Sequence, residues 1–448
     1  MNQQGGQPMI SNTFNETFSQ EWINKNLPDP TNELVLFRQI IPWEKLVKQL
    51  SKFYNKEDGR FGKSIRMVVA ILILSKLRLL SDVKVIEQIR ENRYYQYFCN
   101  VPDKELFFFL SPSSLTRIRQ RYGIKGTEII EKNIFDKLRK AGVINSEYAL
   151  IDSSVLENNI VYPTDVKLVY KALSKICLFA KHHNLELWWC HDEMKAIWRE
   201  FCLNKEKNAW DYLFEFSEVL KCALFGLELH IQNLKASEKT KKKAEELLGL
   251  LILLDSQNDL KIQGVRHIEN RIVSLDEVDA RPIKKGKKHP NCEFGTTFQA
   301  TFNRQGFMIT VENFIGKPND KILYPEALEL FKQRMKVYPD IAVTDLGYRS
   351  KKNLAESKTK VTNTFMGRSE DVPEEMRTAC QKARSATEGF IAVIKHWRGM
   401  KRCLYKGFSG DRIWSLLCQT AHNLKKFLQL YKNEDLSEKA LIKLRLLS

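Results

Sequence analysis

The stretch FGTTFQATFNRQGFMITVEN, residues 294–313, decides the class of fold that the sequence predicts. Two runs rich in aromatic and β-branched residues flank NRQG (303–306), a four-residue segment whose glycine suits a turn, so the pattern is typical of a β-hairpin. The next segment, DKILYPEALELFKQRM (320–335), has helical spacing. KVYPDIAVTD (336–345) then contains a short buried strand that ends in Asp345.

The run EYALIDSSV, residues 147–155, adds a first strand, which we expect to end in Asp152. A long helical segment separates it from the hairpin, and helical periodicity also dominates the N-terminal third of the chain. Strand, helical segment, hairpin, helix and strand in this order predict a mixed α/β fold, in which a mixed sheet is flanked by helices and interrupted by a large helical insertion. The predicted parts are a loose leader (1–30), an all-helical N-terminal DNA-binding region (31–145), the first part of the sheet domain (146–165), the helical insertion (166–265), the remainder of the sheet domain (266–400) and a basic C-terminal helical region (401–448).

The N-terminal region contains one segment suited to reading DNA. RMVVAILILSKLRLLSD (66–82) predicts a buried helix, and VKVIEQIRENRYYQYFCN (83–100) predicts a second, amphipathic one. SPSSLTRIRQRYG (111–123) begins with a Ser/Pro start signal and continues as a basic helix. Such helices suit a helix-turn-helix arrangement in a DNA groove, although an ordinary bundle with a polar face gives the same pattern. The arginines of this helix that we expect to contact DNA are Arg117, Arg119 and Arg121.

The charge of the chain favours a polyanionic partner. The 448 residues include 72 Lys and Arg against 54 Asp and Glu, which gives a formal charge of +18. Residues 381–448 hold 14 basic and 5 acidic residues, so +9 lies in this segment, and a smaller basic run, KKGKKH, occupies residues 284–289. Double-stranded DNA is the partner that this distribution predicts.

The cysteines and the apolar runs indicate where the protein works. The nine cysteines form no CxxC pair and lie in apolar or helical surroundings, so we expect reduced thiols and no zinc site. The N-terminal residues lack the apolar core of a secretory signal, and the longest apolar runs fall far short of the ~20 residues of a membrane span. We therefore expect a cytoplasmic protein with no membrane partner.

Charged residues on a C-terminal helix point to a possible catalytic site. Arg384, Glu388 and Lys395 lie within about 40° of one another around a helix axis. A solvated salt-bridge face gives the same stripe. Asp152 and Asp345, each at an expected strand end, could converge with Glu388, and three close carboxylates need cations to offset their repulsion. Two Mg²⁺ ions would serve, and they could activate a water or a 3′-hydroxyl and stabilise the leaving oxygen of a phosphodiester.

Other carboxylates compete for these roles. Asp152 and Asp345 could also be ordinary turn residues. We expect Asp165 and Asp320 to fix loops, and Asp340 precedes its strand instead of ending it. Glu157 is a further competitor.

At these residues the chain resembles the DDE transposases of bacterial insertion sequences. Arg384, Glu388 and Lys395 match the R(3)E(6)K part of their Y-R-E-K signature, although Gln381 stands at the tyrosine position. Five further segments are similar to motifs of that group, in the same order along the chain: NNIVYPTD (158–165), KGKKHPNCEFG (285–295), GKPND (316–320), VTDLGYRSKKN (343–353) and AHNLKKF (421–427). Together with the N-terminal helical part, the resemblance covers most of the chain.

The resemblance implies an RNase H-like catalytic core with Asp152, Asp345 and Glu388 as the metal-binding triad. It implies two Mg²⁺ ions per site, which Mn²⁺ can replace, cleavage at terminal inverted repeats, transfer of the 3′-hydroxyl ends to target DNA, and a homodimer in the synaptic complex of a nucleoid-associated bacterial protein. A transposase-derived DNA-binding protein without catalysis and an RNase H-like nuclease without strand transfer are the alternatives. The further residues that we expect to contact DNA are Lys284, Lys285, Lys287, Lys288, Tyr348, Arg384, Lys395, Lys401 and Arg402.

Overall fold

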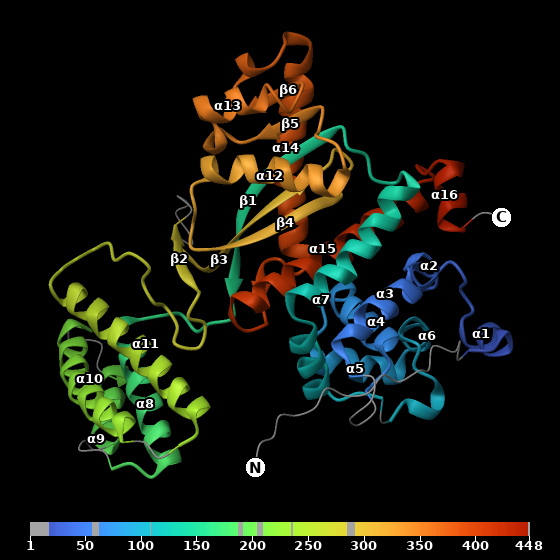
Figure 1. Ribbon diagram of the computed structural model, residues 1–448. Helices are drawn as coiled ribbons and strands as arrows, with labels where there is room; N and C mark the ends of the chain where they lie inside the picture. The colour runs from blue at the N-terminus through green and yellow to red at the C-terminus, as the bar shows by residue number, and fades with distance from the viewer. Residues whose placement is uncertain are drawn as a thin grey trace. The chain divides into compact units, whose positions relative to one another are not determined.

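The computed structural model describes residues 18–55, 62–107, 109–186, 191–203, 209–233, 236–284 and 292–446. The chain divides into two compact units (Figure 1). Unit 1 comprises residues 1–156 and 297–448, and unit 2 comprises residues 157–296. The predicted leader lies outside the described residues up to residue 17, and the rest of it contains the short helix α1 (Gln20–Asn26).

The N-terminal part of unit 1 is helical. Its further helices are α2 (Glu33–Ile40), α3 (Trp43–Leu50), α4 (Ile65–Leu77), α5 (Asp82–Glu91), α6 (Arg93–Cys99) and α7 (Pro112–Ala141). All thirteen residues of α4 are buried, which confirms the predicted buried helix. The single helix predicted at 83–100 is wrong, because the side chain of Asn92 accepts a hydrogen bond from the backbone N–H of Tyr95 and starts α6.

The helix α7 continues well beyond the basic segment that the sequence predicted. Ser111 caps its first turn by accepting a hydrogen bond from the backbone N–H of Ser114. Gly123 interrupts the helical dihedrals with φ +54° and ψ −157°, a conformation that side chains disfavour. The chain therefore bends at Gly123 and resumes the helix as far as Ala141.

A mixed sheet forms the centre of unit 1. Within this unit the strand order is β4-β3-β1-β5-β6, and β7 pairs with β1. β3 and β4 are antiparallel, which confirms the predicted hairpin, whereas β5 is parallel to both β1 and β6. The strands are β1 (Tyr148–Asn158), β3 (Cys292–Phe302), β4 (Met308–Ile315), β5 (Ile341–Thr344), β6 (Asn363–Met366) and β7 (Arg402–Cys403), and β2 (Arg281–Lys284) pairs with the first residues of β3 within unit 2.

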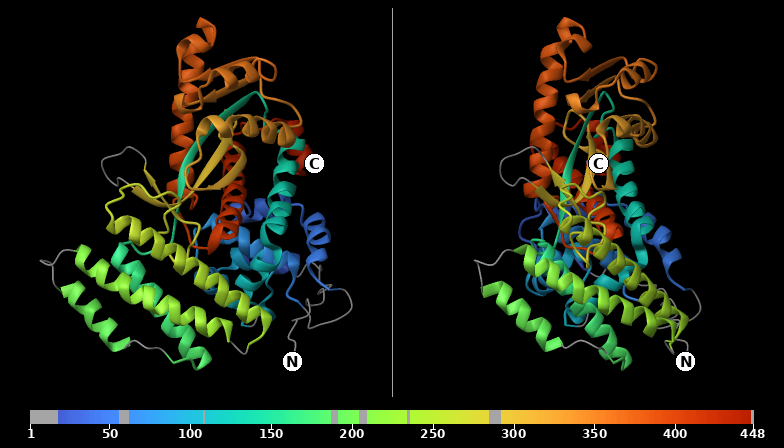
Figure 2. Two further views of the ribbon diagram at one scale, coloured as in Figure 1. Left: turned by 60° about the vertical axis from the view of Figure 1, so that its left-hand side comes forward. Right: turned by 90° about the vertical axis from the view of Figure 1, so that its left-hand side faces the viewer.

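Helices cover both faces of this sheet, which confirms the predicted mixed α/β architecture. Side chains alternate between the faces of a strand, so Ala149 and Ile151 share one core with α12, while Tyr148 and Leu150 share another with α14. Figure 2 shows α12 and α14 on opposite sides of the sheet. The helices of this part are α12 (Asp320–Met335), α13 (Lys351–Ser357), α14 (Glu374–Trp397), α15 (Gly407–Lys432) and α16 (Glu438–Leu444).

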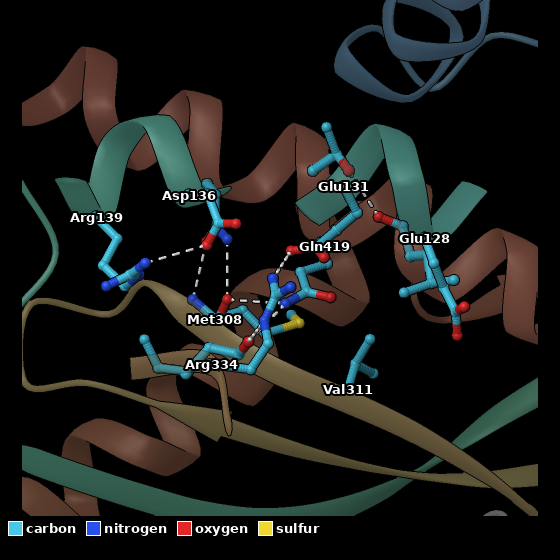
Figure 3. A network of polar contacts seen from close by, with 12 residues as sticks. Glu128, Glu131, Asp136, Arg139, Met308, Val311, Arg334 and Gln419 are labelled. Atoms are coloured by element: carbon cyan, nitrogen blue, oxygen red, sulfur yellow. Dashed lines mark hydrogen bonds and ion pairs between the residues drawn. The ribbon is translucent and has the colours of Figure 1, made fainter. Parts of the chain in front are cut away.

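Side chains from the helices cover the backbone of β4. Gln419, on α15, donates to the carbonyl oxygens of Met308 at 3.0 Å and Ile309 at 3.1 Å (Figure 3). Asn423 exchanges two hydrogen bonds of 2.9 Å with the backbone of Met308. Arg412 donates to the carbonyl of Val311. An open strand edge is a template for unwanted pairing, and these side chains occupy its polar groups.

Unit 2 is a helical body with its own core. Its helices are α8 (Asp165–His183), α9 (His191–Leu203), α10 (Ala209–Gln232) and α11 (Glu238–Ile262). Tyr170 of α8 stacks on Trp198 of α9, with ring centroids 4.5 Å apart, and Asp165 forms an ion pair with Arg271. None of the described helices of the chain is long and apolar enough to cross a membrane.

Candidate active site

The parallel pairing of β1 and β5 brings two acids together. Ile151 pairs with Thr344, Asp152 is the next residue on β1, and Asp345 directly follows the end of β5. Both acids take the side-chain positions that face α14, because side chains alternate along a strand. The expectation that the first strand ends in Asp152 is wrong, since β1 continues to Asn158.

Glu388 approaches these acids from α14. The buried side of this helix is formed by Cys380, Ala383, Thr387 and Ile394, at the 3-4-7 spacing of a helix face. Glu388 follows Thr387, at the border of that face. A cavity of about 30 Å³, room for an ion or one or two waters, is lined by Ile151, Asp152, Val343, Thr344, Asp345, Arg384, Thr387 and Glu388. The structure therefore brings the three predicted acids to one cavity.

Local donors hold the acids in this cavity. The backbone N–H of Ser153 donates to Asp152 at 2.7 Å, and that of Gly347 donates to Asp345. Burial, together with the neighbouring carboxylates, raises the pKa of Asp152 to about 6, and the Ser153 hydrogen bond opposes this rise. The Glu388 side chain is 70% exposed and lies 3.7 Å from Arg384. The acids therefore repel one another across a partly buried space.

The chemistry of these side chains fits a divalent cation, although their present arrangement is not a finished metal site. Oxygen ligands are those that Mg²⁺ prefers, and three carboxylates share one small cavity. Among the described residues, however, no group of three or more His, Cys, Asp and Glu side chains is placed to hold a metal ion. In particular, Glu388 points largely to solvent.

Asp320 is a fourth acid beside this site, although the sequence pattern predicts that it fixes a loop. It is the first residue of α12 and accepts a hydrogen bond of 2.9 Å from the hydroxyl of Ser153, the residue after Asp152. A Cβ atom on Gly347 would lie 3.0 Å from Asp345 Oδ1 and 3.3 Å from Asp320 Oδ2, so these two carboxylates flank one backbone position. No spacing rule links Asp320 to the other acids, and only its position at a helix start within GKPND marks it.

Two residues predicted to contact DNA are buried. Tyr348 is 1% exposed, and its hydroxyl accepts a hydrogen bond of 3.3 Å from Gln299. Arg119 is 8% exposed and donates to both carboxylate oxygens of Asp82, at 3.0 and 2.9 Å. We correct both assignments, because Tyr348 is almost fully covered and the guanidinium group of Arg119 is already paired with Asp82. Their partners lie far away in the sequence, so local patterns could not indicate this burial.

The other predicted contacts fall in three places. Arg384 lines the cavity, and Lys395 lies about three helical turns further along α14. Gln381, at the signature tyrosine position, donates to the hydroxyl of Ser369 at 3.1 Å. Arg121 lies over the ring of Tyr54, 5.1 Å from its centroid. Exposed positions are taken by Arg117, Lys284, Lys401 and Arg402, whereas Lys285, Lys287 and Lys288 lie outside the described residues.

A known protein family is similar to the N-terminal part of the chain. Residues 21–121 match the family model described as "Transposase domain (DUF772)". The N-terminal part of the chain is therefore similar to a transposase domain. The match ends before Asp152, so it does not include the acids of the cavity.

A relative places the chain in a family. Over 165 residues it is 32% identical to a Rhizobium meliloti protein described as "Uncharacterized protein ORF8 in nfe locus". The aligned part covers 36% of this chain and 78% of that protein, and the chain belongs to the same family. No solved structure matches the chain.

Proposed function

We propose that this chain is a DDE transposase that cleaves phosphodiester bonds at the ends of a mobile element and transfers the 3′-hydroxyl ends to target DNA. One observation carries the proposal: Asp152, Asp345 and Glu388, far apart in the sequence, line one cavity. Acids that repel one another are costly as a structural device, and phosphoryl transfer is a chemistry that uses them. The transposase domain at residues 21–121 supports the same conclusion.

An RNase H-like core is part of this proposal. The strand order β4-β3-β1-β5-β6 supports it. The hairpin of β3 and β4 lies on one side of the central strand β1, and β5 and β6, which run parallel to β1, lie on the other side. The first acid lies on the central strand, the second follows the next parallel strand, and the third lies on the helix after the sheet. This arrangement agrees with the resemblance seen in the sequence.

The roles of the residues follow from their positions. Asp152, Asp345 and Glu388 would hold two Mg²⁺ ions, or Mn²⁺ in their place; when bound, such ions activate the attacking water or 3′-hydroxyl and stabilise the leaving oxygen. Arg384, on the rim of the cavity, would bind a DNA phosphate with its planar guanidinium group. The raised pKa of Asp152 means that cation binding must compete with a proton below about pH 6.

Alanine variants of the three acids test the proposal. Asp152→Ala, Asp345→Ala and Glu388→Ala should each lose Mg²⁺-dependent nicking of plasmid DNA and joining of labelled end DNA, while DNA binding is retained. Asp340→Ala is the matched control, because this acid is exposed, precedes β5 and makes only backbone hydrogen bonds. Nicking by Asp345→Ala at the wild-type rate would refute the assignment. Nicking by the wild type without joining would identify a nuclease instead.

The end DNA for this assay comes from the sequences that flank the reading frame. Inverted repeats bracketed by a short direct duplication are the expected substrate. We also propose a homodimer in the synaptic complex, because two ends must be held together. Gel filtration with and without end DNA measures this, and a monomer in both cases contradicts it.

A further inference from the structure

A groove in unit 1 lies apart from the cavity of the acids. Its volume is about 860 Å³, and it is lined by the end of α4, the start of α5, the bend of α7 and the first turns of α15. Its walls are largely apolar, with Leu404 51% and Val83 49% exposed. Its cationic lining residues are Lys76, Arg119, Arg121, Lys125 and Lys406.

The floor of this groove contains a buried lysine without an anionic partner. Lys76 is 3% exposed and belongs to the largely apolar helix α4. Its ammonium nitrogen lies 2.9 Å from the ring centroid of Trp414 and 4.4 Å from that of Tyr405. Among the described residues it has no hydrogen bond or ion pair. Burial lowers the pKa of Lys76 to about 8, which leaves it mostly charged at neutral pH.

An unpaired buried charge is costly, and aromatic faces offset only part of that cost. Among the described residues that line the groove, the acid is Asp82, and it is already paired with Arg119. Asp82 acts on Lys76 only through space, so in the described part of the chain Lys76 has no directly bonded anion. Arg121, Lys125 and Lys406 lie on the same groove and carry the same sign of charge, so the lining is complementary to an anion from outside.

We propose that this groove binds a DNA strand, with one backbone phosphate over Lys76 and neighbouring phosphates at Lys125 and Lys406. The sugar–phosphate backbone alternates anionic groups with apolar sugar faces, as the lining of the groove alternates cations with apolar side chains. This inference rests on the proposed function only in taking DNA as the polyanion. The groove supplies affinity and register and is separate from the catalytic acids.

Charge-reversal variants on the rim test the proposal by fluorescence anisotropy with labelled DNA. Lys125→Glu and Lys406→Glu should each weaken binding by roughly tenfold or more, because each exchanges an attraction to phosphate for a repulsion. Each lost phosphate contact should also reduce the slope of log affinity against log salt by about 0.9 for duplex DNA. Both side chains are exposed, so folding should be preserved. Lys432→Glu, at the other end of α15, is the matched control and should bind like the wild type.

A variant of the floor residue gives a second, independent readout. Lys76→Met removes an unpaired buried charge, so its melting temperature should equal or exceed that of the wild type, while its DNA affinity falls. This combination separates a binding role from a structural one. Unaltered affinity and salt slope in Lys76→Met, Lys125→Glu and Lys406→Glu would overturn the proposal, and so would an equal loss in Lys432→Glu.

The same titrations with duplex and single-stranded probes identify the form of DNA. A larger loss for one probe assigns the groove to that form, and equal losses assign it to the backbone common to both. Because anisotropy needs no cleavage, failure of this proposal leaves the nicking assay intact. Failure of the nicking assay likewise leaves the binding result intact.

Discussion

Replacing Arg334 with methionine should destabilise unit 1 in a pH-dependent way. Arg334, on α12, donates to Glu131, on α7, and to the carbonyl of Ile309 at 3.4 Å (Figure 3). Glu131 is 4% exposed, and burial raises the pKa of its carboxyl although Arg334 lowers it. Methionine can keep the contact that the arginine makes with Phe135, so the substitution removes chiefly the charge.

The size of the effect follows from the choices left to Glu131. A buried carboxylate that loses its partner costs about 3–5 kcal/mol. Glu131 can instead take up a proton. This costs about 1.4 kcal/mol for each unit by which the pH exceeds the ordinary pKa of 4.5, so protonation at pH 7 costs about 3 kcal/mol. This smaller value sets the expected loss of unfolding free energy. In a unit of about 300 residues it lowers the melting temperature by about 5 °C.

The sign of the pH dependence follows from linkage. Because the folded-state pKa of Glu131 is raised, the folded chain holds this proton more tightly than the unfolded chain does. The stabilisation from the proton is present below pH 4.5 and is lost as the pH rises. The penalty of Arg334→Met should therefore fall from about 3 kcal/mol at pH 7 to less than about 1 kcal/mol at pH 5.

Thermal melting followed by near-ultraviolet circular dichroism at both pH values measures this. The double variant Glu131→Gln/Arg334→Met should recover most of the loss, since it leaves no buried charge behind. Arg368→Met is the control, because Arg368 pairs with Glu370 at 3.2 Å in an exposed ion pair worth less than about 1 kcal/mol. A melting loss in Arg334→Met that is the same at pH 5 and pH 7 would show that packing, and not charge, is lost.

Two further predictions concern the site and its support. Gly347→Ala should reduce nicking more than tenfold, because the new methyl group would lie 3.0 Å from Asp345 Oδ1. Its melting temperature should stay within about 2 °C of the wild type. Paired nicking and melting measurements test this prediction, and normal nicking would contradict it. His422 is 1% exposed and donates from Nε2 to the carbonyl oxygen of Gly306 at 2.7 Å. Because burial lowers the pKa of His422 to about 4, its contribution to stability should be present above pH 6.5 and lost as the pH falls toward 4. Denaturant titrations across this pH range should show that the unfolding free energy falls less with decreasing pH in His422→Gln than in the wild type. An equal fall in both would refute this role of His422.

Local patterns predicted the elements that depend on local interactions. The hairpin around Gly306 follows from alternating side chains and a turn glycine, which are properties of adjacent residues. The meeting of Asp152 and Asp345 follows from parallel strands whose register places them side by side. The approach of Glu388 could be inferred only in part, since helical spacing shows which residues share a face but not what that face contacts.

Contacts between distant segments escaped the sequence. Arg119 has the spacing of a basic recognition helix, yet its charge is used by Asp82, 37 residues earlier. Asp320 reaches Ser153 across 167 residues. The groove around Lys76 combines segments near residues 80, 120 and 405, and in the sequence its lysine lies at the polar end of an apolar run. Such sites exist only after packing, so periodicity and charge count cannot locate them.

The support of the acids suggests how the site keeps its form before a cation arrives. Each acid has a partner close by in the sequence: Ser153 and Gly347 donate to Asp152 and Asp345, and Arg384 forms an ion pair with Glu388. These donors lie one, two and four residues away, so they act as soon as each element forms. Convergence, in contrast, depends on the pairing of β1 with β5 and on the packing of α14. A change that shifts the register of β1 by one residue would turn Asp152 to the face covered by α12 and would separate the acids while leaving every local donor in place.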